Sequence, residues 1–222
     1  MRAKVAPDGS PVEIYRRLPA TGEPELIHGA IPAGASILEL GCGAGRVTHE
    51  LIRLGHPVTA VDESPEMLEH VRGAEVVQAG IESLELGRAF DCVVLASHFV
   101  NDVDPARRRR LLDVCARHVI PAGCVLVESY PADFDWESSV GRTSVHGDVA
   151  ITVTAAHIDG PVVDAVVEYA LDGRTWRQPF TARRLDESEL AAALGEVGLR
   201  FVRWLDDQRS WCEARPCENR AS

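Results

Sequence analysis

The chain has 222 residues, of which 45% are apolar, and a formal net charge of −11 at pH 7. This length and composition fit a globular chain with a substantial core, and the sequence lacks the roughly 20-residue apolar run of a membrane-spanning helix. The negative charge disfavours nucleic acid as a partner, because binding to phosphate backbones depends on a basic surface.

Apolar runs alternate with helical patterns from residue 36 to about residue 130. Strands are expected at residues 36–40, 57–62, 74–80, 90–97 and 123–130. Helices are expected at residues 46–54, from Ser64 and Pro65 onward, and between Asp104 and His118. The alternation predicts an α/β fold, a Rossmann-like doubly wound and mostly parallel sheet. In such a fold ligands bind outside the carboxyl ends of the strands.

The pattern changes after residue 147. Three β-rich runs at residues 148–158, 162–171 and 174–184 are separated by Asp-Gly pairs and predict an antiparallel β-meander. Asp186 with Glu189 has the spacing of a capping box, which opens a helix that stops near Gly198. Residues 199–205 and 209–214 then predict a closing pair of antiparallel strands.

The first predicted strand runs into a glycine loop, in which residues 37–46 read ILELGCGAGR. Glycines allow sharp turns and close approach of a ligand to the backbone. A dinucleotide fingerprint needs its third glycine at Arg46, and no Gly-Lys-Ser or Gly-Lys-Thr is present, so a dehydrogenase and a phosphate loop are disfavoured. Asp62 ends the second strand, 21 residues after Gly41, where a carboxylate can accept both hydroxyls of a ribose. The loop therefore predicts a nucleoside ligand without pyrophosphate, and the alternative is a tight turn with Asp62 as a helix cap.

Residues 39–45 (ELGCGAG) resemble the first motif of the class I S-adenosylmethionine-dependent methyltransferases. Residues 61–68 (VDESPEML) resemble the second strand and following helix of that family, and residues 118–127 (HVIPAGCVLV) resemble its turn into strand five. The similarity covers roughly residues 30–130 and is of the small-molecule type. It implies an enzyme with S-adenosylmethionine as cofactor, and it leaves the methyl acceptor open.

The resemblance also implies which residues contact the cofactor. Glu39, Gly41 and Gly43 would line its methionine side, Asp62 would hold the ribose, and Met67 would pack near the adenine. The full expected set is Tyr15, Glu39, Gly41, Cys42, Gly43, Gly45, Asp62, Glu63, Met67, Gly80, Ile81, Glu82 and Ser97. Many relatives carry an aspartate after strand three, where this chain has Gly80-Ile81-Glu82. The adenine amine would then be met by a backbone group or by Glu82.

Catalytic candidates follow strands four and five. The cofactor supplies an activated methyl group, so the protein mainly has to align the acceptor, and a general base is needed only for a protonated acceptor. His98 is a candidate base near neutral pH, the alternative being a side chain packed on the strand end. Asp102 would orient a polar acceptor or cap the next helix, and Tyr130 would contact substrate.

The residues after strand four also narrow the acceptor. They read Ser97-His98-Phe99-Val100, in place of the Asn/Asp-Pro-Pro-Tyr/Phe of many relatives that methylate nucleic acids and proteins. We therefore expect methyl transfer to an oxygen or nitrogen of a small-molecule metabolite, with a silent cofactor-binding protein as the alternative. No metal site is expected, because the six cysteines form no zinc-binding cluster with histidines.

One domain is expected over residues 1–222. Its parts are an N-terminal cap segment at 1–30, a cofactor-binding core at 31–147, the meander over the acceptor site at 148–184, and a closing helix and strands at 185–222. Residues 1–10 are polar and lack a secretory signal, which favours a cytoplasmic protein without a membrane partner. The sequence is compatible with a homodimer and does not fix the oligomeric state.

Overall fold

The computed structural model describes residues 5–7 and 9–217, and the rest of the predicted cap and closing segments lies outside the described residues. The α-helices and 3-10 helices are α1 (Val12–Tyr15), α2 (Glu23–Ala30), α3 (Arg46–Arg53), α4 (Pro65–Leu68), η1 (Ile81–Ser83), η2 (Phe99–Asn101), α5 (Pro105–His118), α6 (Trp136–Ser139) and α7 (Glu187–Gly195). The strands are β1 (Ile37–Leu40), β2 (Val58–Asp62), β3 (Glu75–Gln78), β4 (Phe90–Leu95), β5 (Val119–Glu128), β6 (Thr143–His146), β7 (Val149–Asp159), β8 (Val162–Leu171), β9 (Arg174–Arg183), β10 (Leu199–Trp204) and β11 (Trp211–Pro216).

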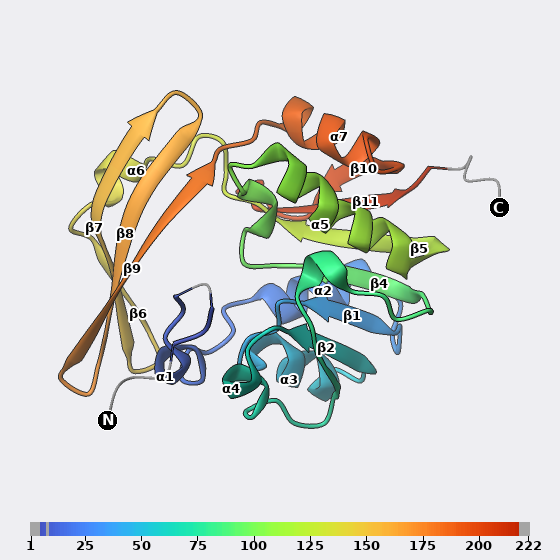
Figure 1. Cartoon of the computed structure of the whole chain (residues 1–222), viewed down its shortest axis with the longest axis horizontal. Helices are drawn as coiled ribbons and strands as arrows, with labels where there is room; N and C mark the ends of the chain where they lie inside the picture. The colour runs from blue at the N-terminus through green and yellow to red at the C-terminus, as the bar shows by residue number, and fades with distance from the viewer. Residues whose placement is uncertain (1–4, 8, 218–222) are drawn as a thin grey trace.

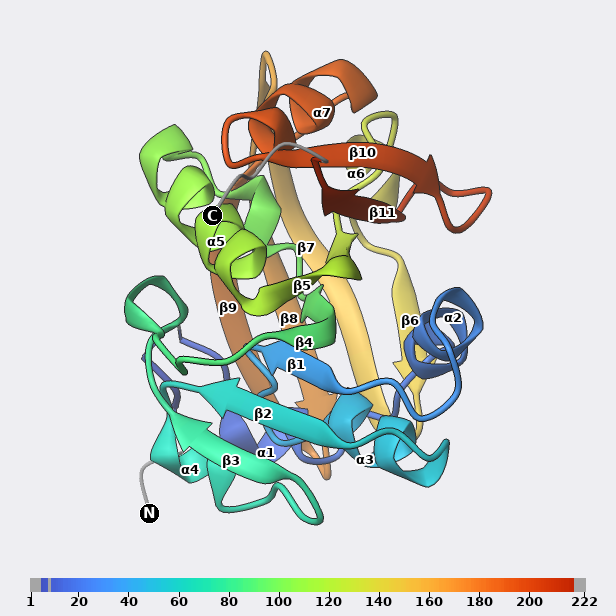
Figure 2. The same cartoon turned by 90° about the vertical axis from the view of Figure 1, so that its right-hand side faces the viewer.

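Seven strands form the central sheet in the order β10-β11-β5-β4-β1-β2-β3. Neighbouring strands from β5 to β3 pair in parallel, and β11 runs antiparallel to both β5 and β10. The chain moves outward from β1 to β3 and then returns to place β4 on the other side of β1 (Figure 2). This reversal between β1 and β4 is the point at which doubly wound sheets bind ligands, and the predicted fold class is confirmed.

Helices cover both faces of this sheet because the buried strands are apolar on both sides. Leu38 and Leu40 face a core cluster that includes Leu111 and Leu112 of α5 and leucines of α7. Ile37 faces the opposite cluster, which is built with α2 and α3. The parallel strands are thereby held from two sides, which fixes the positions of their carboxyl ends.

A second sheet with the order β6-β7-β8-β9 stands beside the first (Figure 1). Its three long strands are the predicted meander, and the Asp-Gly pairs lie at their turns, where Asp172 and the following Gly173 have positive φ. The fourth strand, β6, and the short helix α6 before it were not predicted. Strand β6 is short and mostly exposed, so its sequence shows no clear alternation of apolar and polar residues.

Local capping signals explain several helix boundaries. The Ser64 hydroxyl accepts a hydrogen bond from Met67 N, and Asp104 accepts one from Ala106 N at the start of α5. The predicted capping box is present, since Asp186 and Glu189 bond each other's backbone N–H groups. Within residues 5–7 and 9–217, no helix has the length and apolar character to span a membrane.

Candidate cofactor and acceptor site

The glycine loop after β1 turns back against the end of β2. Gly41, Gly43 and Gly45 all have positive φ, of 73°, 55° and 86°. The backbone N–H groups of Gly41 and Cys42 both donate to Val61 O, at 2.8 and 2.9 Å. A Cβ atom on Gly41 would lie 2.4 Å from Cε2 of Phe99, so only glycine fits there.

Asp62 closes the other side of the loop. Its Oδ2 accepts a hydrogen bond from Gly43 N at 2.8 Å, and its Oδ1 accepts one from Ser64 N at 2.9 Å. These two backbone donors fix the plane of the carboxylate at the carboxyl end of β2. A carboxylate oxygen can accept more than one hydrogen bond, as binding of a ribose diol requires.

Glu39 is the buried acid of the loop, with 3% of its surface exposed. The Thr48 hydroxyl donates to its Oε2 at 2.5 Å. Burial raises the pKa of Glu39 to about 7, although the hydrogen bond from Thr48 and the charge of Arg46 act in the opposite direction. The carboxyl group is therefore poised to ionise when a cation binds next to it.

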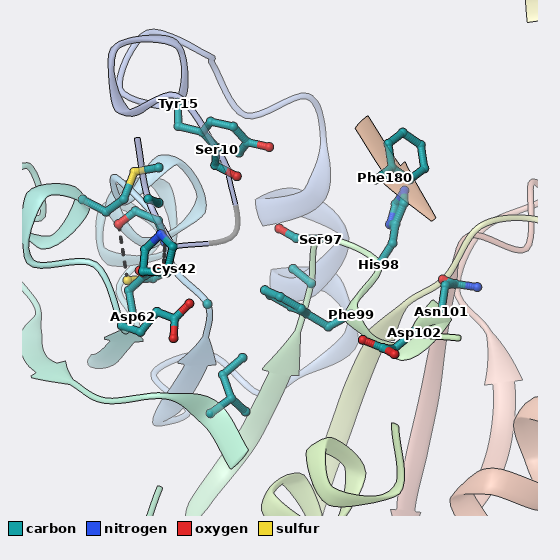
Figure 3. Close-up of a pocket in the computed structure, with 18 of the residues that line it drawn as sticks. Ser10, Tyr15, Cys42, Asp62, Ser97, His98, Phe99, Asn101, Asp102 and Phe180 are labelled. Carbon is teal, nitrogen blue, oxygen red and sulfur yellow. Dashed lines mark hydrogen bonds between the residues drawn. The ribbon is translucent and has the colours of Figure 1, made fainter. Parts of the chain in front are cut away.

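A cavity of about 550 Å³ joins the glycine loop to the meander. Figure 3 shows Cys42 and Asp62 on one side, with Ser10 and Tyr15 over them, and His98 and Phe180 on the other side. Of the residues predicted to contact the cofactor, all except Gly45 line this cavity. Gly45 instead caps α3 next to the ring of His49.

His98 and Ser97 have an unusual backbone at the end of β4. Both adopt left-handed conformations, with φ of 55° for Ser97 and 58° for His98. Glu128 of β5 accepts the Ser97 N–H through Oε2 at 2.6 Å, and the same oxygen lies 3.4 Å from His98 Nδ1. Two consecutive non-glycine residues with left-handed backbone conformations are strained, and the surrounding structure must hold them in place. Such strain is concentrated at functional sites.

Aromatic side chains form the wall behind His98. The Tyr130 ring meets the His98 ring edge-on with 3.7 Å between centroids. Trp136 and Phe180 lie 5.0 and 6.1 Å from the Tyr130 ring, measured between centroids. Burial raises the pKa of the Tyr130 hydroxyl, so this side chain is neutral near pH 7.

Asp102 and Glu82 line the cavity but are engaged by arginines of α5. Arg107 donates to Asp102 Oδ2 at 2.5 Å and to Glu82 Oε1 at 2.8 Å. Arg110 donates to the second oxygen of Glu82 at 2.5 Å. The basic run therefore pairs with acids beside the cavity, which sequence spacing alone did not indicate.

Lining residues that were absent from the predicted set include Phe99, Trp136, Gln178 and Phe180. Phe99 packs on Gly41, and its position just after β4 was a usable signal. The other three reach the cavity from α6 and β9. Their approach depends on long-range packing and carries no local sequence signature.

A protein-family model described as "Methyltransferase domain" matches residues 37–123. An uncharacterized methyltransferase of Mycobacterium tuberculosis is 38% identical over 104 residues, which are 45% of this chain and 43% of that protein. A ubiquinone biosynthesis O-methyltransferase of Xanthomonas axonopodis pv. citri is 34% identical over 103 residues, 41% of each chain. The chain therefore spans less than half the length of these relatives.

Residues 37–123 are therefore similar to a methyltransferase domain, in agreement with the resemblance noted in the sequence. Among solved structures, the sugar N-methyltransferase KedS8 from Streptoalloteichus has a TM-score of 0.72 at 20% identity and covers 89% of this chain and 88% of its own. The amino pentose methyltransferase CalS10 from Micromonospora echinaspora, solved with S-adenosylmethionine bound, has a TM-score of 0.66 at 21% identity, with 86% and 87% covered. These similarities show that the fold extends beyond the family match into the meander.

The residues around the glycine loop fit S-adenosylmethionine, the cofactor that the sequence resemblance implies. A Cβ atom on Gly43 would meet no atom within 4 Å, so the loop leaves room beside the Asp62 carboxylate. Glu39 supplies an ionisable acid for an α-ammonium group, and Met67 supplies a buried apolar side chain that lines the cavity. These two carboxyl groups and the apolar Met67 side chain thus match a ligand that has a ribose diol, a cationic amine and no phosphate.

Proposed function

We propose that this protein transfers the methyl group of S-adenosylmethionine to an oxygen or nitrogen of a small-molecule metabolite. The observation that carries the proposal is the single cavity lined by the glycine loop and Asp62 at one end and by His98 and Tyr130 at the other. A cofactor held at the loop would present its methyl group toward the second end. Two solved structures of similar fold, a sugar N-methyltransferase and an amino pentose methyltransferase, favour a small acceptor.

The chain's own residues would act mainly by alignment. The bound cofactor supplies an electrophilic methyl group, so correct placement of the acceptor lone pair provides much of the rate enhancement. His98 would take the proton of a protonated acceptor, and Glu128, 3.4 Å from Nδ1, would stabilise the imidazolium that forms. Tyr130 would hold the His98 ring in place and exclude water from it.

Calorimetric titration with S-adenosylmethionine and S-adenosylhomocysteine tests the cofactor half of the proposal. We expect micromolar binding by the native chain and binding at least roughly tenfold weaker by Asp62→Ala, which loses charge-assisted hydrogen bonds to the ribose. Asp91→Ala is the matched control, because Asp91 also accepts a backbone N–H, from Ser36, but does not line the cavity. Absence of binding by the folded native chain would exclude the proposal.

Turnover tests the acceptor half. With an acceptor identified by release of S-adenosylhomocysteine, His98→Ala should lower kcat by about 10²–10⁴-fold while cofactor affinity is retained. Full cofactor affinity without methyl transfer to any acceptor would favour a silent cofactor-binding protein instead. An unchanged kcat in His98→Ala would remove the proton-transfer role and leave alignment alone.

A further inference from the structure

Two buried polar atoms in the meander half of the cavity have no hydrogen-bond partner among the described residues. They are Nε1 of Trp136, whose side chain is 3% exposed, and Oε1 of Gln178. Both residues line the cavity. Buried donors and acceptors are nearly always paired, so a bound molecule that supplies the missing partners would satisfy this region.

The amide orientation of Gln178 follows from its other atom. Nε2 of Gln178 donates to the hydroxyl of Ser10 at 3.1 Å, which leaves Oε1 as an acceptor that needs a donor. Trp136 offers only a donor, because the indole ring has no acceptor atom. The two side chains therefore call for a ligand that carries both an acceptor and a donor group.

Aromatic rings surround Trp136 in this part of the cavity. The Trp136 ring lies 5.8 Å from Phe180 and 5.0 Å from Tyr130, centroid to centroid. Rings at these distances form a wall against which the face of a ligand ring can pack. The space therefore favours a cyclic ligand over a flexible chain.

The charged side chains that line the cavity disfavour an anionic acceptor. Five acids line it, namely Glu39, Asp62, Glu63, Glu82 and Asp102. The two arginines among the described lining residues are engaged, since Arg46 pairs with Glu23 and Arg107 pairs with both Glu82 and Asp102. A phosphate or carboxylate on the acceptor would meet acidic groups without an available arginine to neutralise it.

We infer that the methyl acceptor is a neutral or cationic ring compound that binds through two hydrogen bonds, accepting one from Trp136 Nε1 and donating one to Gln178 Oε1. This inference rests on the proposed function and deepens it by naming the acceptor class. Hydroxylated or amino-substituted rings carry both groups, whereas their phosphorylated or carboxylated counterparts are rejected. Trp136 and Gln178 are specificity-determining residues that touch the acceptor.

Ligand-observed NMR titration of the chain saturated with S-adenosylhomocysteine tests the inference with matched pairs. The pairs are glucosamine with glucosamine 6-phosphate, pyridoxine with pyridoxine 5′-phosphate, and 3,4-dihydroxybenzyl alcohol with 3,4-dihydroxybenzoate. We expect at least one uncharged or cationic member to bind, and its anionic counterpart to bind at least roughly tenfold more weakly. Trp136→Phe, which keeps a ring, and Gln178→Met should each weaken the binding member by about two- to tenfold.

The control variant is Trp176→Phe, which removes a tryptophan from the same strand as Gln178 but outside the cavity lining. It should leave probe binding unchanged. Anionic members that bind as tightly as their partners, unchanged binding in both Trp136→Phe and Gln178→Met, or no binding by any member would each overturn the inference. Retained binding of S-adenosylhomocysteine in those cases keeps the cofactor half of the proposed function, while its loss in the native chain would make the proposed function itself fail.

Discussion

Replacing Glu39 by Gln should change how the stability of the protein depends on pH. Burial raises the pKa of Glu39 from 4.5 to about 7 in the folded chain. The folded state then binds more protons than the unfolded state between these values, so this group stabilises the fold at low pH. That stabilisation is lost as pH rises through 7. Glutamine keeps an oxygen for the Thr48 hydroxyl and cannot ionise.

The size of the effect follows from the two pKa values. With 4.5 for the unfolded and about 7 for the folded carboxyl, the contribution of Glu39 falls by about 2 kcal/mol between roughly pH 5.5 and pH 8. Urea unfolding of the native chain and Glu39→Gln at both pH values isolates this contribution, because every other group is common to the two proteins. If the free energy of unfolding depended on pH in the same way in both proteins, the conclusion that Glu39 is buried and largely protonated would be refuted.

The remaining predictions concern the same loop and the caps. A cationic amine favours the ionised form of Glu39, so binding of S-adenosylhomocysteine near pH 6 should release up to about one proton. Calorimetry would show this release as a binding heat that varies with the ionisation enthalpy of the buffer. This buffer dependence should vanish in Glu39→Gln. Gly41→Ala should destabilise the fold by about 1–3 kcal/mol more than Gly43→Ala in denaturant unfolding, since both have positive φ but only the first places a Cβ on Phe99. Equal losses would contradict that packing. Asp186→Ala should cost about 1 kcal/mol in thermal or urea unfolding through loss of the capping box, and a neutral result would make the cap irrelevant to stability.

The cofactor half of the cavity could be predicted because its signals are local. Gly41, Gly43 and Asp62 lie within one strand–turn–helix–strand unit, so their spacing alone places them on neighbouring strand ends. His98 and Tyr130 were expected only at the ends of strands four and five, and they meet because β4 and β5 are adjacent and parallel. Parallel strands bring their carboxyl ends to one edge whatever the intervening sequence does.

The roles of charged side chains at the same edge could not be predicted in this way. Asp102 and Glu82 were expected to contact the acceptor and the adenine, and both expectations stay predictions, but each side chain also pairs with Arg107. The pairing requires η1 and the start of α5 to approach each other, which depends on loop packing. A sequence pattern predicts which strand end a carboxylate follows. It does not predict which basic side chain pairs with that carboxylate in the folded structure.

The cofactor half of the cavity therefore depends on local sequence motifs, whereas the acceptor half depends on packing between distant segments. Trp136 and Gln178 stand 42 positions apart and reach the cavity only because the meander packs beside the central sheet. Neither residue belongs to the glycine loop. Substitutions of Trp136 or Gln178 can therefore alter acceptor binding without disturbing the groups around Asp62. The predicted position of the meander over the acceptor has the same consequence. Exchange of its hairpins should change the range of acceptors while cofactor affinity is kept, because backbone donors of the core hold the Asp62 carboxylate.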